Sequence, residues 1–289
     1  ANAGLDRAIA DLLPELPPEN LVTEPKPAGT AAALTWAALE IARRDSEEAT
    51  MLCIHADWSI VDDEAFRATL LSAEEVAIES NALVTVGIVP TRPDPGFGYI
   101  QPSSAESDGP SRVKRFVEKP EPATAAEMVA AGYLWNSGIF VWRVADFLSE
   151  VRAHSKELAA ALETAGRRDK GAFFGAVKTP VSVDVGILER SARVSVLPGD
   201  FGWDDIGTWS ALRRVRPRDD AGNVTCGDVH VREGRDNVVH SEAGTVVVYG
   251  VDNLVVVARG GLTLVTTSEK ANDLKKLLES LPESVRAPE

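Results

Sequence analysis

A short apolar run that ends in polar residues, Met51–Asp57 (MLCIHAD), indicates the architecture of the first part of the chain. A second apolar run follows at Leu83–Val89, and both runs have the length and composition of buried strands. Between them Phe66, Leu70 and Ala77 recur at helical spacing, after acidic residues that favour the N-terminal end of a helix. Strand, helix and strand at this spacing predict a βαβ unit in a mostly parallel α/β sheet.

The same periodicities extend this layout in both directions. A helix is predicted from Thr30 to about Arg43, and another helical pattern begins near Leu5. Further strands are predicted at Val113–Val117, Ile139–Trp142 and Val194–Leu197, and further helices around Thr124–Ala131, Val144–Val151 and Ser155–Ala165.

The pattern changes after Asp219–Asn223. From there short apolar runs alternate with Gly, Asp and Asn turns, which is typical of a compact β unit, either a small β-helix or a stacked meander. A final amphipathic helix is predicted at Ala271–Leu281. We therefore expect two domains, residues 1–220 and residues 221–289.

Charge and cysteine content narrow the function classes. The 289 residues carry a formal net charge of -14, and we see no cluster of Lys and Arg such as nucleic acid requires. Single nucleotides and sugar phosphates remain as partners, because a few cations, helix N-termini or a metal ion can hold them. The cysteines at 53 and 226 lie too far apart to suggest a disulfide framework, and no apolar stretch approaches the roughly 20 residues of a membrane span. We expect a cytoplasmic protein that binds neither nucleic acid nor membrane.

Two carboxylates are candidates for a metal site. Asp57 ends the first apolar run, and ligands collect beyond the carboxyl ends of strands in open α/β sheets. Asp205 lies in Phe201–Trp209 (FGWDDIGTW), between aromatic residues at a loop-to-helix junction. Each has a structural alternative, since Asp57 could cap a turn and Asp205 could cap a helix that starts near Gly207. Together they could form a two-carboxylate Mg²⁺ site.

Three further segments present polar groups or open backbone in unusual surroundings. Glu118–Pro120 (EKP) stops a strand, and its alternative interpretation is a solvated loop end. Trp135–Gly138 (WNSG) leads into a buried strand, where an Asn either forms a turn or fixes sugar hydroxyls by donating and accepting at once. Gly96–Ile100 (GFGYI) permits close backbone approach to a ligand.

The order of these motifs resembles that of bacterial mannose-1-phosphate guanylyltransferases, which are sugar-phosphate nucleotidyltransferases. The resemblance covers nearly the whole chain. It rests on Glu24-Pro25 with Gly29-Thr30-Ala31, Ala56-Asp57, Pro90–Pro93, Gly96–Ile100, Phe116–Pro120, Trp135–Gly138, Ser182–Asp184 and Gly202–Gly207, followed by Gly222–Val224 where the family enters its C-terminal β-helix.

The resemblance implies a fold and a reaction. The fold would be a Rossmann-like sheet flanked by helices, of the nucleotide-diphospho-sugar transferase type, with a small C-terminal β-helix domain. The reaction would be nucleotidyl transfer from GTP to mannose 1-phosphate, giving GDP-mannose and pyrophosphate. It needs positioning and charge neutralisation but no protein nucleophile.

The resemblance also implies roles for single residues. Asp57 and Asp205 would hold Mg²⁺ and act in catalysis with Lys119, which would contact the sugar phosphate. Glu118 and Asn136 would bind mannose hydroxyls, with Gly98 against the sugar. The residues expected on the nucleotide side are Glu24, Pro25, Thr30 and Ala31.

Departures from the family pattern keep alternatives open. The family's glycine-rich triphosphate loop does not occur in the chain from Ala1 onward, and we expect the βαβ unit that carries it, roughly 30 residues, to precede Ala1. Ala28-Gly29 replaces the family's Arg-Asn, so another base or hexose is one alternative. A non-catalytic regulator that binds a sugar nucleotide is the other. The edge strands of the C-terminal β unit suggest a homodimer.

Overall fold

The chain divides into two compact units. The computed structural model describes residues 5–104, 109–165, 169–272 and 274–286. Unit 1 comprises residues 1–55 and 62–201, and unit 2 comprises residues 56–61 and 202–289. This division differs from the sequence boundary at residue 220 because Trp209 and Leu212 pack against the core of the C-terminal strands. Their apolar contacts therefore join the segment 202–220 to unit 2.

Unit 1 is built on one six-stranded sheet with the order β1-β6-β3-β7-β5-β4. Among the pairings of the described strands in this sheet, only that of β3 with β7 is parallel, and β6 lies antiparallel between β1 and β3. The strands are β1 (Thr50–Cys53), β3 (Leu83–Ile88), β4 (Tyr99–Pro102), β5 (Ser111–Val117), β6 (Leu134–Arg143) and β7 (Val194–Gly199).

The prediction of a mostly parallel sheet is therefore wrong, and the sheet is mixed. β1 and β3 do point the same way, since both run antiparallel to β6, as the predicted βαβ unit requires. The error concerns β6, whose apolar run looks the same in either chain direction. Periodicity identifies a buried strand but does not give its direction.

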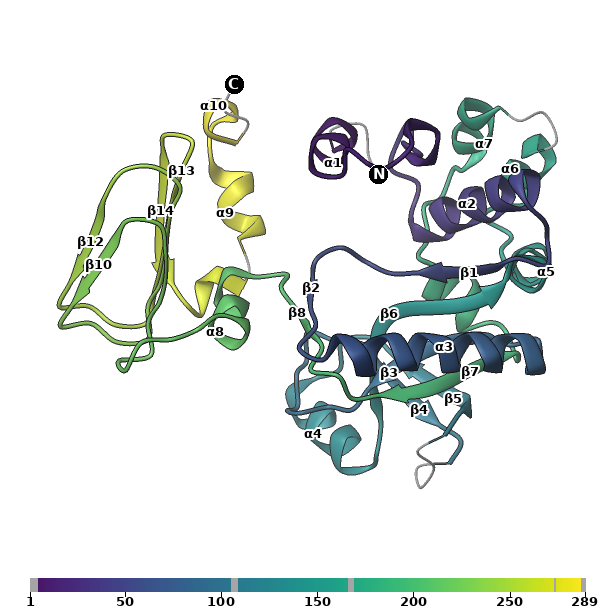
Figure 1. The fold of residues 1–289 in the computed structure, drawn as a ribbon, viewed down its shortest axis with the longest axis horizontal. Coiled ribbons are helices and arrows are strands. Elements are labelled where there is room, and N and C mark those ends of the chain that lie inside the picture. The colour runs from purple at the N-terminus through teal and green to yellow at the C-terminus, as the bar shows by residue number, and fades with distance from the viewer. Residues whose placement is uncertain (1–4, 105–108, 166–168, 273, 287–289) are drawn as a thin grey trace. The chain divides into compact units, whose positions relative to one another are not determined.

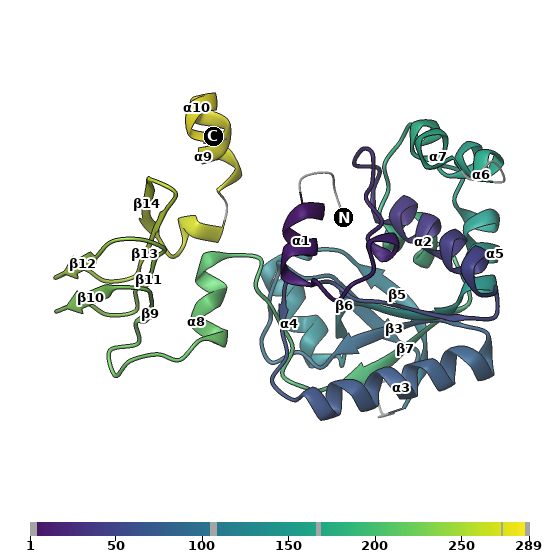
Figure 2. The same ribbon diagram turned by 45° about the horizontal axis from the view of Figure 1, so that its top comes forward.

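Helices cover both faces of the sheet. Figures 1 and 2 show α3 (Asp63–Ser80) along one face and α2 (Thr30–Arg44) with α5 (Val144–His154) on the other. The carboxylate of Asp62 accepts a hydrogen bond from the Ala65 amide at 2.9 Å, which caps α3 as its acidic start predicted. The remaining helical elements of unit 1 are α1 (Asp6–Leu12), η1 (Pro18–Asn20), α4 (Pro122–Ala130), α6 (Ala159–Ala165), α7 (Lys170–Ala176) and the π-helical turn η2 (Asp184–Leu188).

The core between the sheet and α5 is aromatic. Trp142 on β6 stacks on Phe147 of α5 with ring centroids 4.4 Å apart, and Phe140 stacks on Trp142 at 5.4 Å. Cys53 is buried in the same cluster, and its burial raises the pKa of the thiol to about 12. Such a thiol is unreactive at neutral pH, so Cys53 has a structural role in the core.

The start of α2 is fixed by its contact with Val181–Val183. Gly29 has φ +83°, and a Cβ there would lie 2.3 Å from the carbonyl oxygen of Val181. The Ala31 amide donates to that same oxygen at 3.2 Å, and the Thr30 hydroxyl accepts from the Val183 amide at 2.9 Å. Only glycine fits at position 29 without moving the backbone.

Unit 2 contains short parallel strands. β9, β11 and β13 pair in parallel, β10 and β12 pair in parallel, and β14 forms an antiparallel hairpin with β13. Two buried asparagines connect the strand starts, since Asn223 Oδ1 accepts from the Asn237 amide at 3.0 Å and Asn237 Oδ1 accepts from the Leu254 amide at 2.9 Å. The strands are β9 (Val224–Cys226), β10 (Val229–Arg232), β11 (Val238–Ser241), β12 (Val246–Tyr249), β13 (Leu254–Arg259) and β14 (Leu262–Thr267).

The helix predicted at Ala271–Leu281 is shorter than expected. Ala271 is buried in the core of unit 2 and belongs to the 3-10 turn η4 (Lys270–Asn272), and α9 covers only Lys275–Ser280. Residue 273 lies outside the described residues. Packing of Ala271 thus overrides the helical periodicity at this point. A last short helix, α10, covers Glu283–Arg286.

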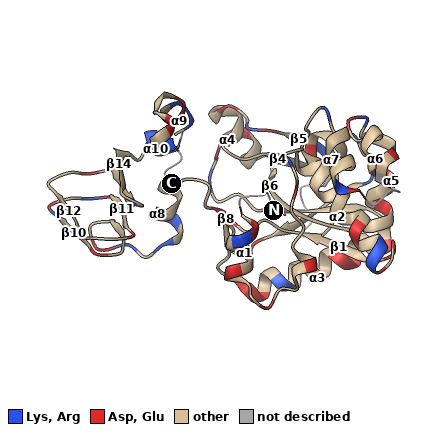
Figure 3. Ribbon diagram, turned by 90° about the horizontal axis from the view of Figure 1, so that it is seen from above, with Lys and Arg blue, Asp and Glu red and all other residues tan. Residues whose placement is uncertain are grey.

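Helix α3 contributes part of the net negative charge. Figure 3 shows both kinds of charge on the helices of unit 1. Within the described ranges, no helix is long and apolar enough to cross a membrane. The acidic residues of α3, set against the single basic residue Arg67, are Asp63, Glu64, Glu74, Glu75 and Glu79.

We expect Gly29→Ala to lower the free energy of unfolding by about 1–3 kcal/mol, because it combines left-handed backbone with a clash on the main chain. Gly175→Ala is the matched control. A Cβ at Gly175 meets nothing within 4 Å, and the residue lies in α7, so this change should stabilise by about 0.4–1 kcal/mol. Denaturant midpoints measure both, and equal midpoints for the two variants would contradict the account.

Candidate functional site

A break in the ladder between β3 and β6 shapes the candidate site. Val86 pairs with Ile139 but the next residue, Gly87, pairs with Asn136, so Ser137 and Gly138 are bulged out of register. The Ser137 hydroxyl donates to the Val86 carbonyl at 2.5 Å and accepts from the Ile139 amide at 3.0 Å. A bulge bends its strand and re-aims side chains.

This geometry corrects the placement of Asn136. Asn136 lies inside β6 rather than in a turn before it, because β6 begins at Leu134 and the Ser137 hydroxyl carries the ladder across the bulge. Gly138 has φ +73°, a conformation that glycine adopts without strain. The motif WNSG therefore builds a bulged strand with an amide side chain at its start.

Four residues from separate elements meet at this bulge. The Asn136 main-chain amide donates to the Gly98 carbonyl at 2.8 Å, and its side-chain Nδ2 donates to Asp184 Oδ1 at 2.8 Å. A Cβ on Gly98 would lie 2.8 Å from Glu118 Oε2 and 3.4 Å from Asn136 Cβ. The structure thus brings together three predicted site residues, Gly98, Glu118 and Asn136.

Asp184 is a member of this cluster to which the sequence interpretation gave no role. It opens the π-helical turn η2, an element that occurs often at functional sites. Burial raises the pKa of its carboxyl, the Asn136 hydrogen bond opposes that rise, and the nearby charge of Glu118 adds to it. The available signal was the motif Ser182–Asp184, but a single Asp in it carries little specificity.

Glu189, just after η2, extends the negative charge of the cluster. Burial raises the pKa of its carboxyl, and the charges of Asp184 and Glu118 raise it further. Three acidic groups therefore interact here. Their oxygens can accept hydrogen bonds from neutral hydroxyl groups of a ligand, whereas their charge would repel an anionic group of a ligand.

Lys119 supplies a cation beside these carboxylates. Its Nζ lies 3.0 Å from Glu118 Oε1, with both side chains largely exposed, so the pair contributes little to stability. The backbone of Lys119 has φ +44°, a left-handed conformation that costs a non-glycine residue about 1–3 kcal/mol. Such strain is found most often where a side chain is held for function.

The residues predicted on the nucleotide side lie at the start of α2 and before it. Thr30 is exposed, while Ala31 is fully buried against Val181. Glu24 is half-buried, and its burial raises the pKa of the carboxyl, whereas Pro25 is exposed. The first amides of α2 are used within the protein, since Ala31 donates to Val181, so this helix end presents few free donors.

The two candidate metal ligands both belong to unit 2 and lie on adjacent segments. β2 (Trp58–Ser59) pairs antiparallel with β8 (Asp204–Asp205), with Trp58 opposite Asp205. The Ile206 amide donates to the Asp57 carbonyl at 3.2 Å, so Asp57 lies one step from Asp205 across the pair. Asp57 is exposed and Asp205 is half-buried.

The neighbouring carboxylate of Asp204 has a different role. Arg214 binds it with two hydrogen bonds, from Nε at 2.6 Å and from Nη2 at 2.8 Å. Across the part of the chain that the structure describes, no group of three or more His, Cys, Asp or Glu residues is arranged to hold a metal ion.

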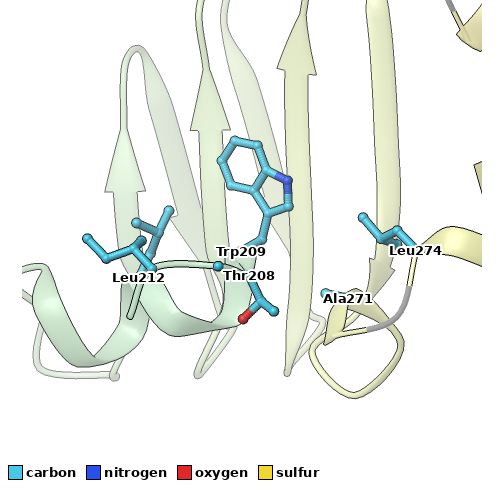
Figure 4. Close-up of a pocket in the computed structure, with 7 residues that line it drawn as sticks. Thr208, Trp209, Leu212, Ala271 and Leu274 are labelled. Carbon is cyan, nitrogen blue, oxygen red and sulfur yellow. The ribbon is translucent and has the colours of Figure 1, made fainter. Parts of the chain in front are cut away.

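Unit 2 also contains an apolar pocket of about 350 Å³ directly after β8. Figure 4 shows Trp209 and Leu212, from η3 (Trp209–Ala211) and α8 (Leu212–Val215), together with Ala271 and Leu274 from the C-terminal segment. The Ala211 amide donates to the Thr208 hydroxyl at 3.3 Å, which caps this turn. The pocket is an apolar gap between the side chains that pack around Trp209. Among the described lining residues, Thr208 has the one hydroxyl side chain.

We expect Asp184→Asn to stabilise unit 1 at neutral pH, because Asn keeps an acceptor for Asn136 and removes a half-buried charge. A carboxyl whose folded pKa is raised costs stability above that pKa, and the cost vanishes below the unfolded value of about 4. The gain in unfolding midpoint should therefore shrink as the pH falls from 7 to 4.

Asp219→Asn is a control for which we expect the opposite effect on stability. Hydrogen bonds from Asn223 hold the pKa of Asp219 below its usual range, so its loss should destabilise at neutral pH and matter less in acid. A pH-independent effect of Asp184→Asn would contradict the electrostatic assignment.

Comparisons with known proteins support the resemblance that the order of motifs indicated. The chain is 36% identical over 280 residues to a mannose-1-phosphate guanylyltransferase of Klebsiella pneumoniae, and 37% identical over 279 residues to one of Escherichia coli. These alignments cover 93% and 92% of this chain but 59% of each relative. The chain thus spans about three fifths of the length of the curated relatives that it matches.

A solved structure, mannose-1-phosphate geranyltransferase from Thermus thermophilus, has a TM-score of 0.81 to this chain at 29% sequence identity. The superposition covers 95% of this chain and 88% of that one. The family model described as nucleotidyl transferase matches residues 9–221. Because that match takes in most of the chain, the chain belongs to the nucleotidyl transferase family.

Proposed function

We propose that this protein transfers the guanylyl group of GTP to mannose 1-phosphate, giving GDP-mannose and pyrophosphate. The observation that carries the proposal is the cluster in which Gly98, Glu118, Asn136 and Asp184 meet. It combines an acceptor-rich wall with one amide that both donates and accepts, the chemistry that recognises sugar hydroxyls. The named relatives, which are similar over more than 90% of this chain, support the same substrate.

In the proposed reaction the sugar phosphate is the nucleophile. An oxygen of its phosphate attacks the α-phosphorus of GTP, the bond from that phosphorus to the bridging oxygen breaks, and pyrophosphate leaves. We call Gly98, Glu118, Asn136 and Asp184 the sugar cluster. Lys119 is the proposed contact to the phosphate, because its Nζ lies beside Glu118 at the edge of this cluster. Catalysis then consists of in-line positioning and stabilisation of charge on the phosphoryl oxygens.

Glu118 and Asn136 are proposed to bind the mannose hydroxyls, with the ring against Gly98. Gly98 suits this role because even a methyl group there would press on the Glu118 carboxylate. Asp184 fixes the orientation of the Asn136 amide through its hydrogen bond. The Asn136 Oδ1 in turn accepts from the Gly138 amide at 3.4 Å, so both ends of the side-chain amide are oriented by the protein.

Asp57 and Asp205 are proposed to hold Mg²⁺. The pairing of β2 with β8 makes them neighbours, and Mg²⁺ in nucleotide enzymes usually takes one or two protein carboxylates with water and phosphate oxygens. The donor set of this chain fits that pattern. A bound Mg²⁺ would neutralise phosphate oxygens of the nucleotide.

The start of α2 is proposed to face the nucleotide, with Glu24 and Pro25 on the preceding segment. Thr30 is exposed there, while Ala31 is held by the Val181 carbonyl and contributes shape rather than a polar contact.

Three wider features belong to the same proposal. The parallel strands of unit 2 are interpreted as turns of a small β-helix, since β9, β11 and β13 stack in register. The edge strand β14, with Leu262 and Val265 exposed, is the proposed contact of a homodimer, which sedimentation showing only monomer would exclude. A cytoplasmic location is proposed because both cysteines are free thiols.

The proposal predicts a substrate profile. Full-length protein with Mg²⁺ and mannose 1-phosphate should release pyrophosphate fastest with GTP among the four NTPs, and glucose 1-phosphate should be a poorer acceptor. Faster release with another nucleotide or hexose would replace the substrate assignment, and release with none would indicate a sugar-nucleotide-binding protein instead.

We expect Asp205→Asn to lower kcat by at least about a hundredfold and to leave the unfolding midpoint nearly unchanged. The substitution removes one of the two carboxylate charges proposed to bind Mg²⁺ but keeps the shape of the side chain. Asp220→Asn, an exposed acid in the same unit, is the matched control and should retain full activity. Undiminished turnover in Asp205→Asn would remove this residue from the metal site.

A further inference from the structure

Arg92 lies against two aromatic rings of unit 1. Its guanidinium carbon is 5.0 Å from the centroid of the Trp135 ring and 5.6 Å from that of Phe97. The two rings meet edge to face, with centroids 4.9 Å apart. A guanidinium over an aromatic face is attracted electrostatically and also packs as a flat plate.

Asp94 fixes the guanidinium and the loop at the same time. Its Oδ2 accepts from Arg92 Nε at 3.1 Å and lies 3.0 Å from Nη2, while its Oδ1 accepts from the Gly96 amide at 2.9 Å. The Tyr99 hydroxyl accepts from the Asp94 amide at 3.0 Å and donates to the Asp94 carbonyl at 3.1 Å. Tyr99 is fully buried, so these hydrogen bonds tie the start of the loop from 94 to 99 to a buried side chain.

Arg92 contacts two aromatic rings, and each ring belongs to the residue just before a member of the sugar cluster. Phe97 precedes Gly98 and Trp135 precedes Asn136, and the Asn136 main-chain amide donates to the Gly98 carbonyl at 2.8 Å. The pairing of Tyr99 with Trp135 continues this contact along the strands. A change in the spacing of the two rings would therefore move Gly98 relative to Asn136.

We propose that Arg92 is a positioning residue for the sugar pocket. Its guanidinium, bound to Asp94 and packed on Phe97 and Trp135, sets the separation of Gly98 and Asn136 without touching the sugar phosphate itself. This inference rests on the proposed function, which makes Gly98 and Asn136 contacts of the hexose.

The chemistry of arginine makes the inference specific. Lysine would keep the positive charge and the ion pair with Asp94, but it lacks the planar group and the second directed N–H. Arg92→Lys in the full-length protein should therefore raise KM for mannose 1-phosphate about fivefold to tenfold, the size of a partly desolvated cation–π contact. KM for GTP should stay within about twofold, because the nucleotide-side residues are not held by this loop.

Arg143→Lys is the matched control. Arg143 ends the same strand that carries Trp135, its Nε pairs with Asp146 at 2.7 Å, and its side chain is 23% exposed against 29% for Arg92. This variant should lower the unfolding midpoint as much as Arg92→Lys does and leave both KM values unchanged. Asp94→Asn, which weakens the hold on the guanidinium, should raise KM for mannose 1-phosphate in the same direction as Arg92→Lys.

Gly98→Ala separates failure of this inference from failure of the proposed function. If Gly98→Ala raises KM for mannose 1-phosphate while Arg92→Lys does not, the pocket stands and the positioning role is overturned. The positioning role would also be overturned if Arg92→Lys raised the KM for GTP as much as the KM for mannose 1-phosphate, or if Arg143→Lys raised the KM for mannose 1-phosphate equally. Either result would indicate a general loss of stability instead. If Gly98→Ala changes neither KM, the sugar pocket itself is misplaced, and the role of Arg92 is overturned with it.

Discussion

The candidate site depends on one interruption of hydrogen bonding between two buried strands. The Ser137 hydroxyl bridges Val86 and Ile139 where the ladder skips Ser137 and Gly138, so the Val86 carbonyl and the Ile139 amide both keep a hydrogen-bond partner at the bulge. The same interruption lets Asn136 bond to Gly98 through its main chain and to Asp184 through its side chain. A regular ladder would satisfy the backbone equally well but would not aim the amide in this way.

The charges in unit 1 are consistent with the proposed binding of a sugar phosphate. Glu118, Asp184 and Glu189 form an acidic group in which burial and mutual repulsion raise the pKa values of Asp184 and Glu189. Such a group of carboxylates accepts hydrogen bonds from neutral hydroxyls and repels a phosphate, which is the proposed ligand of Lys119. In unit 2, Asp204 is neutralised by Arg214, so the proposed role of Asp205 is not shared with its neighbour. Overall negative charge and binding of an anionic substrate are thus compatible.

Local sequence predicted most elements and missed features that depend on distant contacts. Apolar spacing correctly predicted α2, and acidic residues together with apolar spacing predicted α3, since periodicity and capping are local properties. The antiparallel insertion of β6 was not predictable, because an apolar run contains no information about direction. Asp184 was missed for a similar reason, as only the fold brings it 2.8 Å from an amide 48 positions earlier. The resemblance of motifs supplied roles for Glu118 and Asn136, because their residue types alone fitted a structural role (a loop end for Glu118, a turn for Asn136) as well as a binding role.

The central claim is that the hexose of the product lies against the bulge of β6. The most direct measurement is a crystal structure of the full-length protein with GDP-mannose and Mg²⁺. The account predicts sugar hydroxyls within hydrogen-bond distance of the Glu118 carboxylate and the Asn136 side chain, with the ring against Gly98 and the cation on Asp57 and Asp205. A hexose bound elsewhere, with no hydrogen bond to the Glu118 carboxylate or to the Asn136 side chain, would contradict it.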